Sequence, residues 1–207
     1  MCTRFYLQQN APEFNNIFDK VLSSVLADKI THILVKPIKT SGEIYPTDIV
    51  PVIASNRRGE KSEFPMKWGF TLPNSKNPVV NARTETASGK PLFTDAWRRR
   101  RCIIPASWYY EWEHFTSSTG SVKTGSKYAI QPCNSTVTWL CGLYRIENGV
   151  PVFTILTREP SDELRTIHDR MPLILPQEKI EEWIHPDSKP EELLPYALTD
   201  MVAEKEL

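Results

Sequence analysis

The 207-residue sequence lacks several features that would define a specialised class of protein. It has no net charge, only eight glycines, and no apolar run long enough to span a bilayer. The charge balance excludes a strongly basic nucleic-acid-binding protein, so any nucleic acid must meet a local basic surface. Because the first residues contain no apolar segment typical of a secretory signal, we expect a cytoplasmic protein that does not associate with membranes.

Cysteine is scarce, and its spacing argues against a metal site. The four cysteines form no C-x-x-C pair, and no histidine lies at zinc-ligand spacing beside them. We therefore expect free thiols, no metal and no organic cofactor. Cys102 and Cys141 lie in apolar surroundings and are predicted to be buried in the core.

The remaining pattern predicts one α+β domain over residues 1–207, with mostly antiparallel strands and peripheral helices. Apolar residues at helical spacing indicate an amphipathic helix over residues 14–26. β-Branched and aromatic runs between turn residues predict strands at 33–35, 49–53, 102–104, 108–112, 128–131, 137–144 and 152–156.

Short helices and one loop complete this prediction. Ser161 is a candidate helix cap, since two acids follow it, and Pro176 and Pro190 each lie where a short helix can begin. The polar segment 114–127, which is rich in serine and glycine, predicts a hairpin loop.

Cys2 is the first candidate for chemistry. Initiator methionine is usually removed before a small residue, and its removal would leave Cys2 with a free α-amine beside its thiol. The amine titrates near about 8 and the thiol near about 8.5, so both are usable nucleophiles near neutrality. One aldehyde can react with both, first as a Schiff base and then as a thiazolidine ring, which no internal cysteine can form.

Separate motifs along the chain resemble those of one family. They are Met1-Cys2-Thr3-Arg4-Phe5, Pro65-Met66-Lys67-Trp68-Gly69, Asn81-Ala82-Arg83-Thr84-Glu85-Thr86, Arg101-Cys102-Ile103-Ile104-Pro105-Ala106 with Tyr109-Tyr110-Glu111-Trp112, and Ile167-His168-Asp169-Arg170-Met171-Pro172. Together they closely resemble the SRAP (SOS response-associated peptidase) family, in the expected order from residue 1 to about residue 185. The resemblance implies an α+β SRAP domain with a barrel-like core and a role in DNA repair.

The resemblance also implies a site and a partner. Members of the SRAP family bind single-stranded DNA and crosslink to abasic sites through the N-terminal cysteine, and the matching residue here is Cys2. The other catalytic positions fall on Asn81, Glu111 and His168. The DNA-contacting positions fall on Arg4, Arg83, Arg170 and Trp68.

These residue types suit the implied chemistry. Glu111, flanked by aromatic residues, is predicted to have a raised pKa suited to opening the sugar hemiacetal. His168 can shuttle protons near neutrality, and Asn81 can hold the Cys2 amine by a hydrogen bond. The arginines can bind phosphates, and Trp68 can stack on an unpaired base. Residues 98–101, four arginines in a row, are the one dense cationic run and can extend this groove.

Two departures from the family pattern concern the site. Thr3 replaces a usual glycine, so the approach of Cys2 can differ. The segment before Tyr110 lacks a common glycine, and the bulkier Ser107-Trp108-Tyr109 can narrow the groove.

A monomer is expected. Two other functions remain open. The first is a cysteine peptidase or amidohydrolase, including one that removes only a leader residue from its own chain, with Cys2 and His168 as nucleophile and base. The second is a single-strand-binding module that forms no covalent bond, in which the arginines and Trp68 matter and Cys2 does not.

Overall fold

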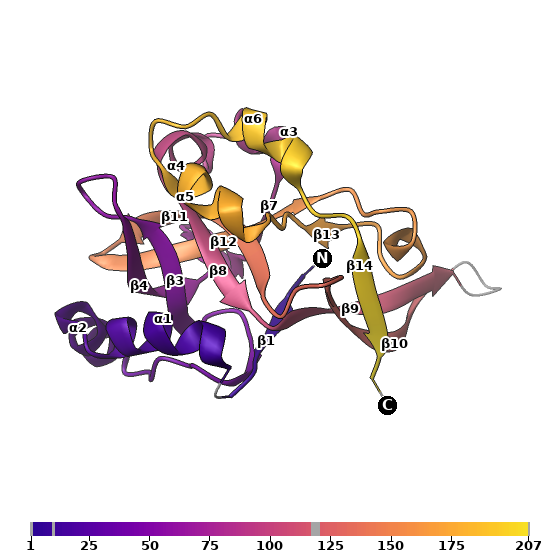
Figure 1. Cartoon of the computed structure of the whole chain (residues 1–207), viewed down its shortest axis with the longest axis horizontal. Helices are drawn as coiled ribbons and strands as arrows, with labels where there is room; N and C mark the ends of the chain where they lie inside the picture. The colour runs from indigo at the N-terminus through magenta and orange to yellow at the C-terminus, as the bar shows by residue number, and fades with distance from the viewer. Residues whose placement is uncertain (1, 10, 117–120, 207) are drawn as a thin grey trace.

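Two main sheets, one of them closed into a barrel, form most of the computed structural model, which describes residues 2–9, 11–116 and 121–206 (Figure 1). The first sheet has the order β14-β10-β9-β1-β2. Its strands are β1 (Arg4–Leu7), β2 (Gly42–Ile44), β9 (Trp108–Thr116), β10 (Val122–Pro132) and β14 (Met201–Lys205).

The second sheet contains the barrel. Its strands are β3 (Ile49–Ser55), β4 (Lys61–Trp68), β7 (Asn81–Arg83), β8 (Arg101–Ala106), β11 (Thr138–Glu147), β12 (Val150–Arg158) and β13 (Met171–Pro172). The path β11-β8-β3-β4-β12 closes because β11 also pairs with β12. β5 (Phe70–Leu72) and β6 (Ser75–Val79) form a separate small sheet. Among the described pairings, β12 is parallel to β4 and β7, and the named strands otherwise pair in antiparallel fashion.

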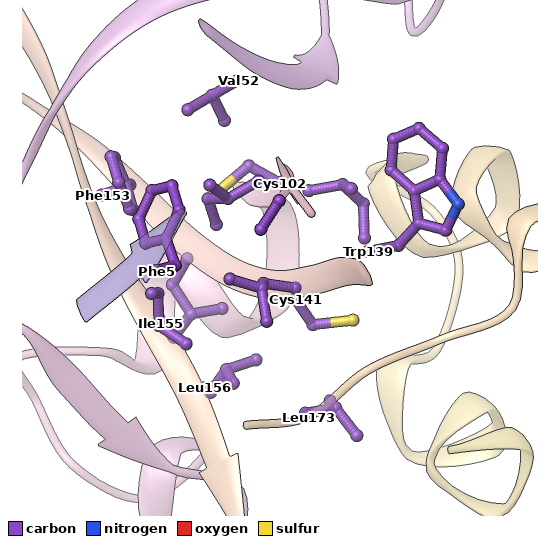
Figure 2. Close-up of a cluster of buried hydrophobic side chains, with 14 of the residues drawn as sticks. Phe5, Val52, Cys102, Trp139, Cys141, Phe153, Ile155, Leu156 and Leu173 are labelled. Carbon is purple, nitrogen blue, oxygen red and sulfur yellow. The ribbon is translucent and has the colours of Figure 1, made fainter. Parts of the chain in front are cut away.

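Two barrel strands, β8 and β12, are mainly apolar because both of their faces are covered. Every residue of β8 is buried, and so is each residue of β12 before its last. Phe5 of β1 reaches this core, where Trp68 lies between it and Phe153, with ring centroids 5.3 and 6.0 Å away. Figure 2 shows Phe5 beside Phe153 and Ile155. Thus β1, which begins two residues after Cys2, is anchored in the core.

Helices cover two flanks of the barrel. α1 (Pro12–Leu22) and α2 (Val25–Leu34) lie along β3 and β4, and the short helices gather on another flank (Figure 1). The latter are α3 (Thr84–Ala87), α4 (Thr94–Arg99), α5 (Ile180–Ile184) and α6 (Pro190–Leu193). Single 3₁₀ turns occur at η1 (Leu164–Thr166), η2 (Gln177–Lys179) and η3 (Leu194–Tyr196).

The structure confirms the α+β class with its barrel-like core, and it corrects the expected first helix. Residues 14–26 form two helices, because the Ser24 hydroxyl accepts a hydrogen bond from the N–H of Ala27 (3.1 Å) and begins α2. Leu22 and Val25, expected on the buried face, are 48% and 86% exposed. Residues 33–35 were expected as a strand, but Ile33 and Leu34 end α2 and Val35 is its C-cap.

The other expected elements are largely present. All six remaining strands are found, several of them longer than expected, and Pro190 opens α6 while Pro176 precedes η2. The expected helix after Ser161 is only the turn η1. The loop expected at 114–127 is strand up to Thr116 and from Val122, and residues 117–120 lie outside the described part. Cys102 and Cys141 are buried free thiols, as predicted.

Candidate active site around Cys2

Cys2 is separated from β1 by Thr3 alone, and it is 0% exposed. Its thiol donates a long hydrogen bond to the carbonyl oxygen of Arg4 (Sγ to O, 3.6 Å). Burial raises the pKa of this thiol well above its ordinary value, and the charge of Glu111 raises it further. The resting thiol is therefore protonated and is a weak nucleophile until a proton acceptor assists it.

Asn81 holds the backbone of Cys2. Its Nδ2 donates a hydrogen bond to the Cys2 carbonyl oxygen (2.8 Å), whereas the sequence led us to expect a bond with the amine. β7 carries Asn81 alongside Ile155 of β12, and the Trp68 indole donates to the carbonyl oxygen of Val80 (3.0 Å), which fixes the residue before it. The Asn81 Oδ1 atom is buried without a hydrogen-bond partner in the described chain. An acceptor is thus available beside Cys2.

Glu111 and His168 face each other next to Cys2. Glu111 on β9 is 3% exposed, and its Oε2 lies 3.9 Å from Nε2 of His168, which follows η1. Burial raises the pKa of Glu111 to about 7. Burial also lowers the pKa of His168 to about 4. Near neutral pH the imidazole is therefore uncharged, and the carboxyl group is close to half protonated.

The backbone sets the tautomer of His168. Its Nδ1 accepts a hydrogen bond from the N–H of Arg170 (3.0 Å), so the neutral ring carries its proton on Nε2, toward Glu111. An Asp169 carboxylate oxygen also lies 2.8 Å from Nδ1, and this contact becomes a hydrogen bond only when Nδ1 is protonated. The carboxylate of Asp169 is mostly exposed, so water can solvate it otherwise.

A pocket of about 340 Å³ opens over the site. It is lined by Thr3, Arg4, Glu111, Trp112, His114 and Thr124. The Arg4 guanidinium lies 4.6 Å from the ring centre of Tyr45 and 5.0 Å from that of Trp112, and it pairs with Glu43 at 3.5 Å. The mouth of the pocket is therefore cationic and aromatic, a combination suited to a nucleic acid strand.

The four expected DNA contacts fall into two pairs. Arg83 is exposed and Arg4 is half-buried at the pocket, so both can meet a phosphate. Trp68 is 0% exposed inside the core, so in this structure its indole has no face open to a base.

Arg170, the fourth expected DNA contact, faces the protein interior in this structure. It is buried, and its fork donates to both carboxylate oxygens of Glu85 (2.9 and 3.0 Å). It donates to the carbonyl oxygen of Thr157 as well (2.7 Å). Although partial burial opposes it, the Arg170 hydrogen bonds hold the pKa of Glu85 below its ordinary value. Arg170 thus supports the segment that carries His168.

The arginine run is not one surface. Arg98, Arg99 and Arg100 are exposed, but Arg101 is fully buried. Its guanidinium donates to backbone carbonyl oxygens around helices α4 and α5, among them those of Trp97 and Trp183, both at 2.8 Å. Burial lowers the pKa of Arg101 to about 10. Arg101 is a structural residue and not part of a groove.

Two residues of the site escaped the sequence analysis. Thr157 is buried at the end of β12, where its carbonyl oxygen accepts hydrogen bonds from Thr84 (3.2 Å) and Arg170. It joins the segments of Asn81 and His168. His114 lines the pocket, and its ring centroid lies 4.8 Å from that of His168. No motif marked either residue, because each acts through contacts between distant segments.

Neither a metal centre nor a membrane helix is found in the described chain. No group of three or more histidine, cysteine or acidic side chains there could hold a metal ion. Within residues 2–9, 11–116 and 121–206, no helix is both long and apolar enough to cross a bilayer.

Fold and site together define an α+β protein with a buried cysteine at its N-terminal strand, surrounded by Asn, Glu and His. The family model described as "SOS response associated peptidase (SRAP)" matches residues 1–207, and the chain belongs to this family.

Curated relatives carry names related to DNA damage. The chain is 34% identical over 165 residues to abasic site processing protein YoaM of Bacillus subtilis, covering 72% of this chain and 68% of that protein. It is 32% identical to YoqW of the same organism, covering 98% and 91%. YedK of Escherichia coli is 31% identical over 58% of this chain and 54% of its own.

Solved structures share the fold. A Bacteroides thetaiotaomicron protein superposes with a TM-score of 0.73 at 20% identity, covering 100% of this chain and 92% of that one. A Bordetella bronchiseptica protein gives 0.70 at 21% identity, with both chains fully covered.

Proposed function

We propose that this protein processes abasic sites in single-stranded DNA by forming a covalent thiazolidine crosslink through Cys2 after Met1 is removed. The relatives' names support the substrate class. The observation that carries the proposal is the convergence of separate segments on Cys2. Asn81 binds its backbone, and the facing pair Glu111 and His168 lies beside it.

Burial of Cys2 favours a substrate of limited size. A fully buried residue is reached only by a group small enough for the adjoining pocket of about 340 Å³. An abasic sugar has no base, and a single strand can bend this sugar inward more readily than a duplex. The cationic and aromatic mouth around Arg4 suits the flanking nucleotides, and the exposed Arg83 suits a phosphate.

The reaction consists of ring opening, one condensation that releases water, and one addition that closes the thiazolidine ring. The sugar opens to an aldehyde when a proton reaches its ring oxygen, and Glu111 with its pKa of about 7 can supply that proton. The Cys2 amine then adds to the aldehyde carbon and water leaves, which gives a Schiff base. The thiol adds next across the C=N bond: a C–S bond forms, the thiol proton passes to nitrogen, and the ring closes.

The protonation states favour this order. The Cys2 thiol has a raised pKa, so the amine attacks first and the thiol follows once a base accepts its proton. Ionised Glu111 is the acceptor at hand, and neutral His168 can take up a proton only at Nδ1, where Asp169 lies 2.8 Å away. Asn81 Oδ1 can accept a hydrogen bond from an N–H or O–H group of the intermediate.

The same protonation states argue against general cysteine peptidase activity. A cysteine–histidine pair works best as thiolate and imidazolium. Here burial raises the pKa of Cys2 and lowers that of His168, so both charged forms are disfavoured. The geometric contact of His168 is with Glu111.

The test uses untagged protein and a single-stranded oligonucleotide with one abasic site. We expect a species that survives a denaturing gel, and its loss in Cys2→Ala but not in Cys133→Ala, which removes a thiol outside the pocket. An oligonucleotide whose abasic aldehyde has been reduced should give no adduct. Equal adduct from Cys2→Ala would refute the proposal. Salt-sensitive binding without any adduct would identify a non-covalent single-strand-binding module.

A further inference from the structure

His114 lies directly against His168 at the solvent side of the site. It is exposed on β9, opposite Thr124 of β10, and its ring is inclined by 52° to that of His168. Its backbone N–H donates to the carbonyl oxygen of Ile167 (3.1 Å), which ties β9 to the residue before His168. The contact is thus built from both backbone and side chain.

We propose that His114 is a positioning residue of this site, which shields the imidazole of His168 from water and opposes a positive charge on it. The proposal deepens the proposed function, because it assigns control of His168 to a residue that no motif marks. His114 acts through His168 and not on the DNA aldehyde itself.

Shielding follows from the packing. His168 is buried, and the ring of His114, which lines the pocket, lies against it with the ring centroids 4.8 Å apart. A charged imidazolium loses hydration when it is covered, so the neutral ring is favoured.

A positive charge on His114 also favours the neutral form of His168. The groups that face the two rings are Glu111 on β9, Arg4 on β1 and Asp169 beside His168. Burial is the main reason that the pKa of His168 is lowered, Asp169 opposes this, and a positive charge on His114 adds to it. Two imidazolium ions at this separation repel each other, so a charged His114 disfavours a charge on His168.

The consequence is a base that stays available in mild acid. A neutral His168 keeps its capacity to accept a proton at Nδ1, beside Asp169, when the thiol adds to the Schiff base. Without His114, His168 would take up its proton at higher pH, and the reaction would slow at a higher pH on its acid side.

The experiment combines two readouts on the full chain. NMR titration of ring protons follows four histidines in all, so His168 can be assigned by substitution. His114→Ala removes both cover and charge, His114→Phe keeps a cover without charge, and His32→Ala removes an exposed histidine of α2 as the control. The rate of crosslinking to the abasic oligonucleotide is measured across the same pH range.

We expect the titration midpoint of His168 to rise by about one pH unit in His114→Ala and by a smaller amount in His114→Phe, with no change in His32→Ala. The acid limb of the crosslinking rate should move with the midpoint. An unchanged His168 midpoint in both His114 variants overturns the proposal, and so does a shifted midpoint with an unmoved acid limb. The midpoint is read without DNA, so a wild-type protein that never crosslinks would refute the proposed function separately.

Discussion

Replacing Glu111 with glutamine removes an ionisable group from the buried side of the pocket while keeping its shape. Glu111 is 3% exposed, and burial raises its pKa from an ordinary 4.5 to about 7. A folded-state pKa above the unfolded one means that the stabilising contribution is complete below about pH 4.5 and is lost as the pH rises through about 7. At pH 8 the ionised Glu111 therefore lowers the free energy of unfolding of the wild-type protein, whereas the glutamine variant has no such loss.

The magnitude follows from proton linkage. Each tenfold change in proton affinity corresponds to about 1.4 kcal/mol, so ionising Glu111 in the folded protein reduces the free energy of unfolding by about 3 kcal/mol at pH 8. His168 has the opposite linkage. Because its pKa is lowered, it reduces stability as the pH falls from about 6.5 toward about 4. Both proteins carry His168, so its effect largely cancels when they are compared.

Urea unfolding followed by tryptophan fluorescence measures this difference at pH 5, 6, 7 and 8. We expect Glu111→Gln to gain stability relative to wild type as the pH rises, by about 2–3 kcal/mol between pH 5 and 8. It should also form the crosslink more slowly than wild type, with less effect on DNA affinity. A constant difference between the two proteins at all four pH values would show that Glu111 titrates normally and would refute burial as a cause of a raised pKa.

Three further changes test the fold and the DNA-binding face. Arg101→Met leaves several buried carbonyl oxygens without a donor, so it should reduce the free energy of unfolding by about 3–5 kcal/mol in urea. Gly142→Ala places a Cβ 2.7 Å from an Ile104 methyl carbon and 2.8 Å from the Thr154 carbonyl oxygen, and should destabilise by about 1–3 kcal/mol in the same assay. Arg83→Gln should weaken binding to single-stranded DNA, as measured by fluorescence anisotropy. It should also reduce the slope of the logarithm of the binding constant against the logarithm of the salt concentration by about 1.

Matched controls accompany these variants. Arg99→Met changes an exposed arginine, and Gly89→Ala adds a Cβ whose nearest neighbour is 3.9 Å away, so both should unfold like wild type. A fourth variant, Arg170→Gln, is not a control: it should reduce the free energy of unfolding in urea, because it breaks the ion pair with Glu85. An Arg101→Met protein as stable as Arg99→Met would contradict a structural role for Arg101. An unaltered salt slope in Arg83→Gln would contradict a phosphate contact at Arg83.

The regular elements were largely predictable from the sequence, because local patterns determine them. Buried β-branched runs such as residues 102–104 and 152–156 lie in strands, as expected. The helix at 14–26 was wrong because its apolar spacing continues through Ser24, whose capping hydrogen bond begins a second helix. Closure of the barrel depends on the pairing of β11 with both β8 and β12, which no local pattern reveals.

The site was only partly predictable, and mainly through resemblance to the family. Cys2, Asn81, Glu111 and His168 do lie together, although their spacing along the chain gives no physical reason to expect it. Residue type alone does not say which way a side chain faces. Trp68 and Arg170 were therefore expected to meet DNA, and both are buried. His114 follows no motif, and only the approach of β9 to the segment after η1 identifies it.

The decisive measurement for thiazolidine formation at Cys2 is the intact mass of the adduct between untagged protein and an abasic oligonucleotide, with and without borohydride. We predict a mass equal to protein without Met1 plus DNA minus one water, unchanged by borohydride, with the modification mapped to Cys2. A protein extended before Cys2 should give no such product. An adduct that gains two hydrogens with borohydride, or one that forms equally in the extended protein, would contradict a thiazolidine at the N-terminal cysteine.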